Sequence, residues 1–304
     1  MRTIVNMLRL PNLLIIAFTL LLIRHFLFIP VYDSAGILPV TTALQYRLMI
    51  VATMLIAAAG YISNDYFDVI ADRVNKPRRQ YIGTRISAAS ALAYAFILST
   101  ASVAIAAWLS VNMKSLIPLL ILATALAVAW WYAARLKKSF LWGNIAVSCM
   151  SAGTIVMAWL IEQIGSNLPA QESKSISLIV IAVSVFAFLL SLLREIVKDL
   201  EDIEGDKMIG CHSLPITIGI SSTRKTLYVL SAVTTALLIY TQAQLLHNSR
   251  VFAAAWLLMA VVVPMIYFVV LLGKSQSKKD FHKLSTLLKW IMLGGMLTLP
   301  AGHF

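Results

Sequence analysis

The stretch ISLIVIAVSVFAFLLSLL, which runs from Ile176 to Leu193, contains no charged residue. A helix of this length, at about 1.5 Å per residue, nearly crosses the roughly 30 Å of hydrocarbon in a bilayer. The next 14 residues, REIVKDLEDIEGDK from Arg194 to Lys207, include nine charged side chains. This abrupt change predicts a helix that crosses a membrane and emerges into water.

Eight other apolar runs of similar length occur along the chain, although Lys289 interrupts the last of them near its start. The composition agrees, because 60% of the residues are hydrophobic, 12% are charged and the mean hydropathy is +0.85, whereas a soluble domain has about 25% charged residues. We therefore predict an all-α polytopic membrane protein, a single domain over residues 1–304, with about nine transmembrane helices. The candidate spans are Asn12–Tyr32, Leu44–Ser63, Ala88–Ser110, Ser115–Ala134, Leu141–Ile164, Ile176–Leu193, Thr226–Leu246, Val251–Gly273 and Leu284–Pro300. The first has no small-residue cleavage site and is expected to be retained.

The basic residues indicate the orientation. Of the 25 Lys and Arg residues, Arg24 falls within the first span and four fall on one side of the membrane, which leaves 20 for the side that holds the N-terminus. Because cytoplasmic loops carry the excess of Lys and Arg, we predict a cytoplasmic N-terminus in a cell inner or plasma membrane. The net charge of +12 lies between apolar runs rather than on a hydrophilic body, so no nucleic-acid partner is expected. The four exceptions are Arg47, Lys114, Lys174 and Arg250.

Acidic residues gather in two segments on the predicted cytoplasmic side. Nine of the 13 lie in NDYFDVIAD, which begins at Asn64, or in the Arg194–Lys207 segment. Each segment has three aspartates separated by three and then four residues, a spacing that puts side chains on one face of a helix. The two triplets are Asp65, Asp68 and Asp72, and Asp199, Asp202 and Asp206.

Two carboxylate faces of this kind favour a divalent cation. Left bare, the carboxylates would repel one another, and an oxygen-only donor set, with the amide of Asn64 added, is typical of Mg²⁺. Cations that could bind a diphosphate surround them, and both loops contain Gly or Pro. The alternative is a solvated charged loop in which the acids pair with neighbouring Lys and Arg. The candidate diphosphate-binding residues are Asn64, Lys76, Arg79, Lys137, Arg194 and Lys198.

These residues resemble a known family. Asn64 to Asp72 resembles the NDxxDxxxD motif of the UbiA superfamily of intramembrane prenyltransferases, and Asp202 and Asp206, followed by Gly210 and Ser213, look like its second DxxxD motif. The similarity extends to the RLPN sequence that begins at Arg9, and to Lys137 and Asn144. The second acidic segment is most similar to digeranylgeranylglyceryl phosphate synthase-like members, although chlorophyll synthases share its Glu-Gly-Asp ending. The chain departs from the family at RQYIG, residues 79–83, where many members have Arg-Pro-(Ile/Leu)-Pro-Ser-Gly.

The resemblance implies nine transmembrane helices around a central, lipid-accessible cavity. It also implies a Mg²⁺-dependent transfer of a polyprenyl group, of which geranylgeranyl is the closest match, from its diphosphate to a lipophilic acceptor. Asn64, Asp68 and Asp72 would hold one Mg²⁺, and Asp202 and Asp206 a second. Asp65 or Asp199 would accept a proton, completing a catalytic set of six aspartates. The implied acceptor is the hydroxyl of a geranylgeranylglyceryl phosphate-type lipid, with an aromatic acceptor of quinone biosynthesis, 4-hydroxybenzoate or dihydroxynaphthoate, as the alternative. Membrane lipids surround the enzyme, and the sequence leaves its oligomeric state open.

Three other classes fit the sequence less well. A transporter usually places its polar residues near the membrane midplane on interrupted helices, whereas these clusters lie at the boundary. A CDP-alcohol phosphotransferase also spaces aspartates by four residues, but its motif needs an Asp-Gly pair followed by Ala-Arg, which is missing here. A structural membrane protein has no reason to carry two carboxylate faces.

Overall fold

The computed structural model describes residues 7–75 and 80–302. Within these residues, nine helical segments are long and apolar enough to cross a membrane. Kinks and π-helical turns divide the first and the last two segments into shorter elements. The elements are α2 (Leu10–Ile23), η1 (Arg24–Phe28), α3 (Ile29–Ser34), α4 (Ala43–Phe67), α5 (Val69–Asn75), α6 (Ala88–Asn112), α7 (Ile117–Ala134), η3 (Leu136–Lys138), α8 (Trp142–Glu162), α9 (Ala170–Met208), α10 (Leu214–His247), α11 (Val251–Leu257), η4 (Leu258–Val262), α12 (Val263–Lys274), α13 (Lys278–Met296) and α14 (Thr298–Ala301). The all-α prediction is confirmed.

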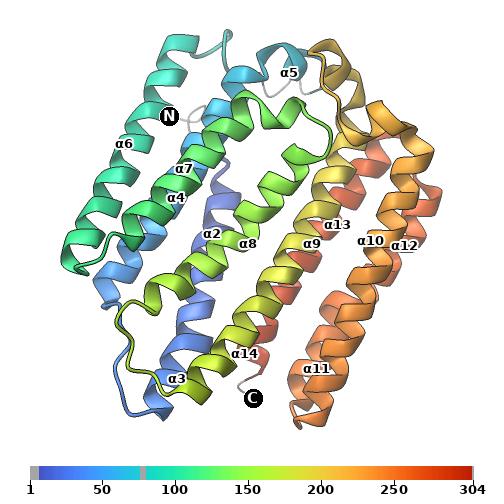
Figure 1. The fold of residues 1–304 in the computed structure, drawn as a ribbon. Helices are drawn as coiled ribbons and strands as arrows, with labels where there is room; N and C mark the ends of the chain where they lie inside the picture. The colour runs from blue at the N-terminus through green and yellow to red at the C-terminus, as the bar shows by residue number, and fades with distance from the viewer. Residues whose placement is uncertain (1–6, 76–79, 303–304) are drawn as a thin grey trace.

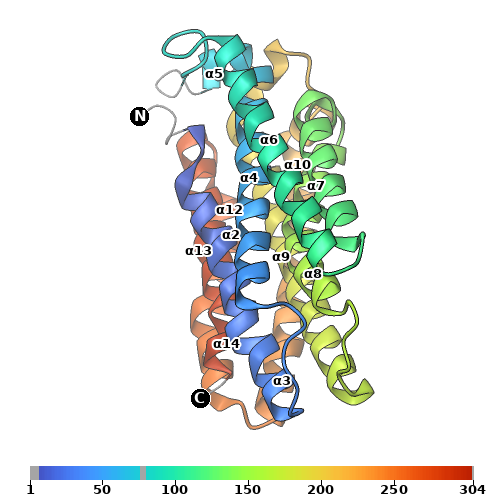
Figure 2. The ribbon, with the colours of Figure 1, turned by 90° about the vertical axis from the view of Figure 1, so that its left-hand side faces the viewer.

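The two ends of the bundle differ. Figures 1 and 2 show α5 across one end, together with the start of α2, whereas α3, α14 and the start of α11 lie at the other. The last turns of α9 contact α5 and therefore belong to the same end as α5. We call this the acidic end, because both acidic segments lie there, and we call the other the opposite end.

Two helices are longer than the sequence predicted. Helix α9 has 39 residues and continues unbroken through the charged segment after Leu193, so it is about 58 Å long and exceeds the bilayer core. Helix α10 begins at Leu214 rather than near Thr226, and it is interrupted at Gly219, which has a φ of 82°. The prediction stopped short because hydropathy identifies the apolar part of a helix and not its polar extension.

Two groups of buried apolar side chains hold the bundle together. The first joins α2, α4, α6, α7 and α8, and the second joins α9, α10, α12 and α13. Helix α9 takes part in both, since Ile176 and Val180 pack into the first group while Leu193 and Ile196 pack into the second. The central helix thus connects the two halves.

Two π-helical turns occur just before prolines. Turn η1 ends two residues before Pro30, and turn η4 ends two residues before Pro264. Proline has no N–H and its ring clashes with the preceding turn, so a locally widened turn relieves the conflict. Both turns border the central cavity, through Phe26 and Leu27 in η1 and Val261 in η4.

A buried polar network fastens the opposite end. Arg24 donates through Nη1 to Thr41 Oγ1 (2.7 Å) and through Nη2 to the Thr41 carbonyl (2.9 Å). Thr41 in turn donates through Oγ1 to Glu162 Oε2 (2.6 Å), and Glu162 is fully buried. Since Arg24 also lies over the ring of Tyr46 at 4.4 Å, the network joins the first, second and fifth spans.

Candidate active site

One large cavity occupies the centre of the bundle. Its volume is about 1130 Å³, and it runs from residues of the acidic end, including Lys137 and Asp206, to Arg250 and Gly302 at the opposite end. Most of its wall is apolar and comes from α2, α4, α7, α8 and α9, for example Ile56, Leu122, Met150, Val183 and Phe186. A chamber with polar groups at one end and a long apolar wall suits a molecule with a charged head and a hydrocarbon tail.

The second acidic segment presents its aspartates to this cavity. Because α9 stays helical to Met208, Asp199, Asp202 and Asp206 share the face that lines the cavity, as their spacing predicted. Asp206 is buried. Asp199 accepts a hydrogen bond from Asn144 Nδ2 at 2.8 Å. Three carboxylates therefore occupy two turns of one helix at the polar end of the cavity.

The first acidic segment does not form a single helical face, so that part of the prediction is wrong. Helix α4 ends at Phe67, and Asp68 leaves the helical region with φ −96° and ψ 7°. Asp68 forms an ion pair with Lys137 and accepts from Asn64 Nδ2 at 2.8 Å. Asp65 pairs with Arg9 at 2.6 Å and lines, with Asp72, a small separate depression. The turn at Asp68 redirects the chain so that α5 crosses to α9.

Asn75 fixes α5 onto α9. Its Nδ2 donates to the Asp202 carbonyl at 2.9 Å, and its Oδ1 accepts from the backbone N–H of Gly205 at 3.1 Å. Glycine is required at 205, because a Cβ there would lie 2.7 Å from the carbonyl oxygen of Ala71. Lys278 Nζ adds a hydrogen bond to the Asn75 carbonyl at 3.0 Å. The two acidic segments are thereby held side by side.

Two cations at this end stay charged because of their carboxylate partners. Burial opposes the charge on Lys137, but the Asp68 carboxylate outweighs it and raises the pKa of Lys137 above its ordinary value. Burial likewise opposes the charge on Arg9, and Asp65 restores it, so that the pKa of Arg9 is also raised. Only Lys137 and Arg9 line the cavity among these four residues, so each carboxylate orients a cation toward it.

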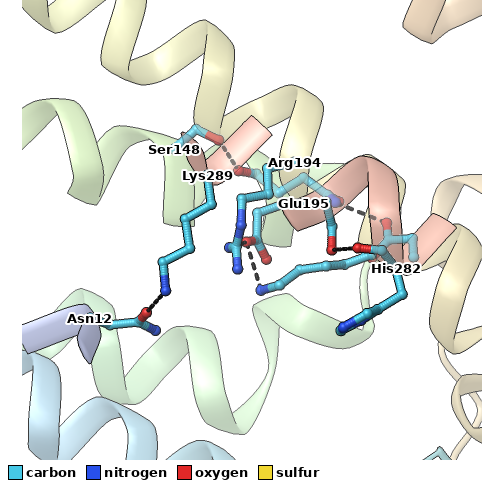
Figure 3. A network of polar contacts seen from close by, with 10 residues as sticks. Asn12, Ser148, Arg194, Glu195, His282 and Lys289 are labelled. Carbon is cyan, nitrogen blue, oxygen red and sulfur yellow. Dashed lines mark hydrogen bonds and ion pairs between the residues drawn. The ribbon is translucent and has the colours of Figure 1, made fainter. Parts of the chain in front are cut away.

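A second group of polar side chains, drawn in Figure 3, lines the same cavity and includes residues of α9 that precede Asp199. Arg194 Nη1 and Lys198 Nζ both donate to the same oxygen of Glu195, Oε1, at 3.1 and 2.8 Å. From α13, Lys289 reaches across to donate to Asn12 Oδ1 at 3.0 Å. All five residues line the cavity. Glu201, on the same helix, instead contacts His282, which is exposed.

The oxygen atoms at the acidic end suit Mg²⁺. Among residues 7–75 and 80–302, no three His, Cys, Asp or Glu side chains form a metal-binding group. Mg²⁺, however, usually takes one or two carboxylates, with water and substrate phosphates completing its shell. Asn64 lines the cavity, and its Oδ1 is buried and has no hydrogen-bond partner in the described chain. A buried amide oxygen of this kind, on a residue that lines the same cavity as Asp202 and Asp206, fits a cation shared with a phosphate-bearing ligand.

The predicted site residues thus separate into groups. Asn64, Lys137, Arg194, Lys198, Asp199, Asp202 and Asp206 line the cavity, whereas Asp65 and Asp72 line the small depression and Asp68 acts through Lys137. Lys76 and Arg79 lie outside the described residues. Glu195, Lys289 and the cavity-lining Tyr61 were missed as site residues. The only signal for Lys289 was its charge within an apolar run.

Comparison with known proteins decides the family. Residues 26–292 match the UbiA prenyltransferase family. The chain belongs to this family. It is therefore an integral, multi-pass membrane prenyltransferase, and the transporter, CDP-alcohol phosphotransferase and non-catalytic interpretations do not apply.

Relatives of this prenyltransferase carry a more specific name. It is 32% identical to digeranylgeranylglyceryl phosphate synthase of Methanosphaera stadtmanae over 246 residues, which cover 80% of this chain and 82% of the relative. It is 28% identical to the synthase of the same name from Hyperthermus butylicus, with 86% and 85% covered. The recognition of the family from its two aspartate motifs is confirmed.

Solved structures agree with the fold. A structure of digeranylgeranylglyceryl phosphate synthase superposes with a TM-score of 0.66 at 23% identity, covering 99% of this chain and 97% of that one. A UbiA homologue from Archaeoglobus fulgidus, bound to DMAPP and Mg²⁺, superposes with a TM-score of 0.62 at 18% identity, covering 98% and 99%. At these identities the likeness establishes the fold.

Proposed function

We propose that this enzyme transfers a geranylgeranyl group from its diphosphate to the free glycerol hydroxyl of a geranylgeranylglyceryl phosphate-type lipid. The observation that carries the proposal is the cavity, which joins a carboxylate- and lysine-lined end to a long apolar wall. The glycerol lipid acceptor is supported by the name shared by the relatives at 28–32% identity. We further propose that the acidic end faces the cytoplasm of a cell inner or plasma membrane, because most of the 25 basic residues fall on that side even without the cavity-lining Arg194, Lys198 and Lys289.

The diphosphate would bind at the acidic end. Mg²⁺, when bound, supplies positive charge to the departing diphosphate. Asn64 and the carboxylates of Asp202 and Asp206 would hold that cation, since all three line the cavity and Lys137, which pairs with the Asn64 partner Asp68, also interacts with Asp206. Lys137 would bind a diphosphate oxygen directly, and Asp68 positions its ammonium group. Lys76 and Arg79, by sequence, are further candidates for the same anion.

Asp199 is the base that the geometry favours. In the transfer, the bond between the prenyl C1 and the diphosphate oxygen breaks, the acceptor hydroxyl oxygen bonds to C1, and the hydroxyl proton leaves. Asp199 lines the cavity one turn deeper than Asp202, where Asn144 orients its carboxylate. Asp65, the other candidate, is paired with Arg9 and faces the small depression. Proton transfer to Asp199 therefore completes the reaction.

The wall of the cavity would protect the reaction from water. The side chains beside the polar end are apolar or aromatic, including Ile56, Ala129 and Tyr132. A carbon that develops positive charge as the diphosphate leaves would otherwise be trapped by water. Tyr132 is the one cavity-lining residue among the aromatic side chains near the first motif and the η3 turn, Tyr66, Phe67, Trp130, Trp131 and Tyr132.

An acceptor panel tests the proposal. Purified enzyme in lipid nanodiscs, with Mg²⁺ and geranylgeranyl diphosphate, is offered geranylgeranylglyceryl phosphate, 4-hydroxybenzoate or dihydroxynaphthoate. We expect diphosphate release and a digeranylgeranyl ether product with the glycerol lipid alone. Prenylation of an aromatic acceptor in its place would assign the enzyme to quinone biosynthesis, and failure with every acceptor would remove the proposal.

A Mg²⁺ titration tests the metal ligands. We expect Asn64→Ala to raise the Mg²⁺ concentration for half-maximal activity by about tenfold, the effect of losing one coordinating or orienting group. Asp72→Asn tests whether the carboxylate in the small depression also takes part, as the sequence predicted. An unchanged Mg²⁺ requirement in Asn64→Ala would exclude the amide as a ligand.

A further inference from the structure

Lys289 is a charged residue in the apolar part of a membrane-spanning helix. It lies on α13, 11 residues after the helix begins at Lys278. Its ammonium group contacts the neutral oxygen of Asn12, and it forms no ion pair with any described residue. An ionisable residue at such depth is costly and is normally kept for a function. Because Lys289 lines the cavity, that function concerns a ligand inside it.

Arg194 and Lys198 provide more positive charge beside Lys289. Both bind one oxygen of Glu195, so a single carboxylate serves two cations. The Nε of Arg194 is buried and has no hydrogen-bond partner in the described chain. Arg194 and Lys289 also point into the same region (Figure 3), where their charges repel each other. The Nε of Arg194 therefore has no protein acceptor, and the positive charges of Arg194, Lys198 and Lys289 outnumber the one carboxylate of Glu195.

The charge surplus matches a phosphate monoester. Arg194, Lys198 and Lys289 contribute three positive charges and Glu195 one negative charge, which leaves +2. Asp199 also interacts with Lys198 and accepts a hydrogen bond from Asn144, so its ionised form lowers the surplus to +1, whereas Arg9 is balanced by Asp65. A phosphate monoester carries about −1.5 to −2 at neutral pH, so it neutralises the surplus both before and after Asp199 takes up a proton, whereas a carboxylate would leave the site positive once Asp199 is protonated.

The site is separated from the diphosphate site along α9. Arg194 precedes Asp202 by eight residues and Asp206 by twelve, which corresponds to about 12 and 18 Å along a helix. The sequence predicted that Arg194 and Lys198 bind the diphosphate together with Lys137. In the structure Lys137 joins Asp68 at the acidic end, whereas Arg194 and Lys198 join Glu195 deeper in the cavity. Two anionic sites at different depths suit a reaction with two anionic substrates.

We infer that Arg194, Lys198 and Lys289, with Asn12, form a binding site for the phosphate monoester of the acceptor lipid. The inference rests on the proposed function and deepens it. Lys289 and Arg194 hold the acceptor phosphate, and Asp199 lies on α9 between this site and Asp202. The acceptor hydroxyl is thereby placed between its own phosphate and the leaving diphosphate. An acceptor is selected for its phosphate as well as for its tail.

The test compares Lys289→Gln with the wild type on two acceptors, geranylgeranylglyceryl phosphate and the same lipid without its phosphate. We expect the variant to raise KM for the phosphorylated acceptor about tenfold, the effect of one charge-assisted hydrogen bond. KM for geranylgeranyl diphosphate should stay unchanged, and the phosphate-free acceptor should not distinguish the variant from the wild type. Lys289→Arg, which keeps the charge, should retain most of the affinity. Lys283→Gln, an exposed lysine on the same helix, is the matched control.

Several results would overturn the inference. A rise in KM for the diphosphate donor would assign the cations to that substrate, and an equal loss with both acceptors would show that the phosphate is not recognised. If Lys289→Gln fails to fold, Lys198→Gln must show the same selective loss. Binding of radiolabelled geranylgeranylglyceryl phosphate without Mg²⁺ or donor gives an independent readout. If the wild type binds this lipid tightly but transfers no prenyl group, the proposed function fails and the phosphate site stands.

Discussion

The two acidic segments share the same spacing of aspartates but differ in their backbone. In the second, α9 continues to Met208, and all three aspartates line the cavity. In the first, the helix ends before Asp68, and each aspartate has different surroundings. The second segment therefore presents carboxylates to the cavity, while the first positions the cations Arg9 and Lys137. Equal spacing gives equal function only where the helix is continuous.

Removing a carboxylate charge from the second acidic segment should give the largest loss of activity. Asp206→Asn keeps the size of the side chain but removes a charge that would hold the cation, so we expect kcat to fall by about 10²–10³-fold. Diphosphate release at saturating Mg²⁺ measures it. Glu204→Gln, an exposed residue of the same helix, is the control and should remain near wild type. Equal losses in both variants would show that general charge matters and not the cavity-lining face.

Substitution of the proposed base, Asp199, should give the second-largest loss of activity. Asp199→Asn cannot accept a proton, and we expect a loss of about 100-fold in kcat. KM for geranylgeranyl diphosphate should be unchanged, because the proposed diphosphate site lies further along α9. Asn144→Ala removes only the hydrogen bond that orients Asp199, so its loss should be smaller. A variant that keeps full kcat would exclude Asp199 as the base.

The contact between the two segments can be broken at one position. Gly205→Ala would push α5 away from α9, because the new Cβ meets the Ala71 carbonyl at 2.7 Å. We expect about 1–3 kcal/mol of destabilisation, a typical cost of overpacking, measured as a lower Tm in detergent. Gly153→Ala is the control, since its Cβ would meet nothing within 4 Å and alanine favours the helix. A Tm that falls equally in both would show that the contact between α5 and α9 is not rigid.

The smallest loss of activity is expected for a substitution in the first acidic segment. Asp65→Asn breaks the ion pair with Arg9, whose side chain is 35% exposed while that of Asp65 is 14% exposed, so solvent screens the pair in part. We expect a reduction of activity of only a few-fold, measured under the conditions used for Asp206→Asn. A loss as large as that of Asp206→Asn would show that the two segments are equivalent after all.

Much of the fold was predictable, because apolar runs of about 20 residues report membrane spans directly. The spans agree with α4, α6, α7 and α8 to within a few residues. Hydropathy could not show that α9 extends through the charged residues to Met208. Nor does any Gly or Pro mark the turn at Asp68, which is explained by the contacts of α5 with α9.

The site was predictable where it lies on one helix and hidden where it joins distant ones. Asp199, Asp202 and Asp206 follow from spacing. Lys289 and Asn12 meet across 277 residues, and nothing local to either indicates its partner. The shared carboxylate of Glu195 is close in sequence to Arg194 and Lys198, but the surplus of charge appears only when Lys289 is brought to the same cavity.

The buried network at the opposite end has a consequence for biogenesis. Arg24 belongs to the first span and Glu162 to the end of the fifth, with Thr41 connecting them. During synthesis the arginine is inserted long before its carboxylate exists, and an unpaired charge within a bilayer is costly. The first four spans therefore remain incomplete until the fifth arrives. A chain truncated before Glu162 should expose this arginine to membrane quality control, whereas one that includes it can close the first half of the bundle.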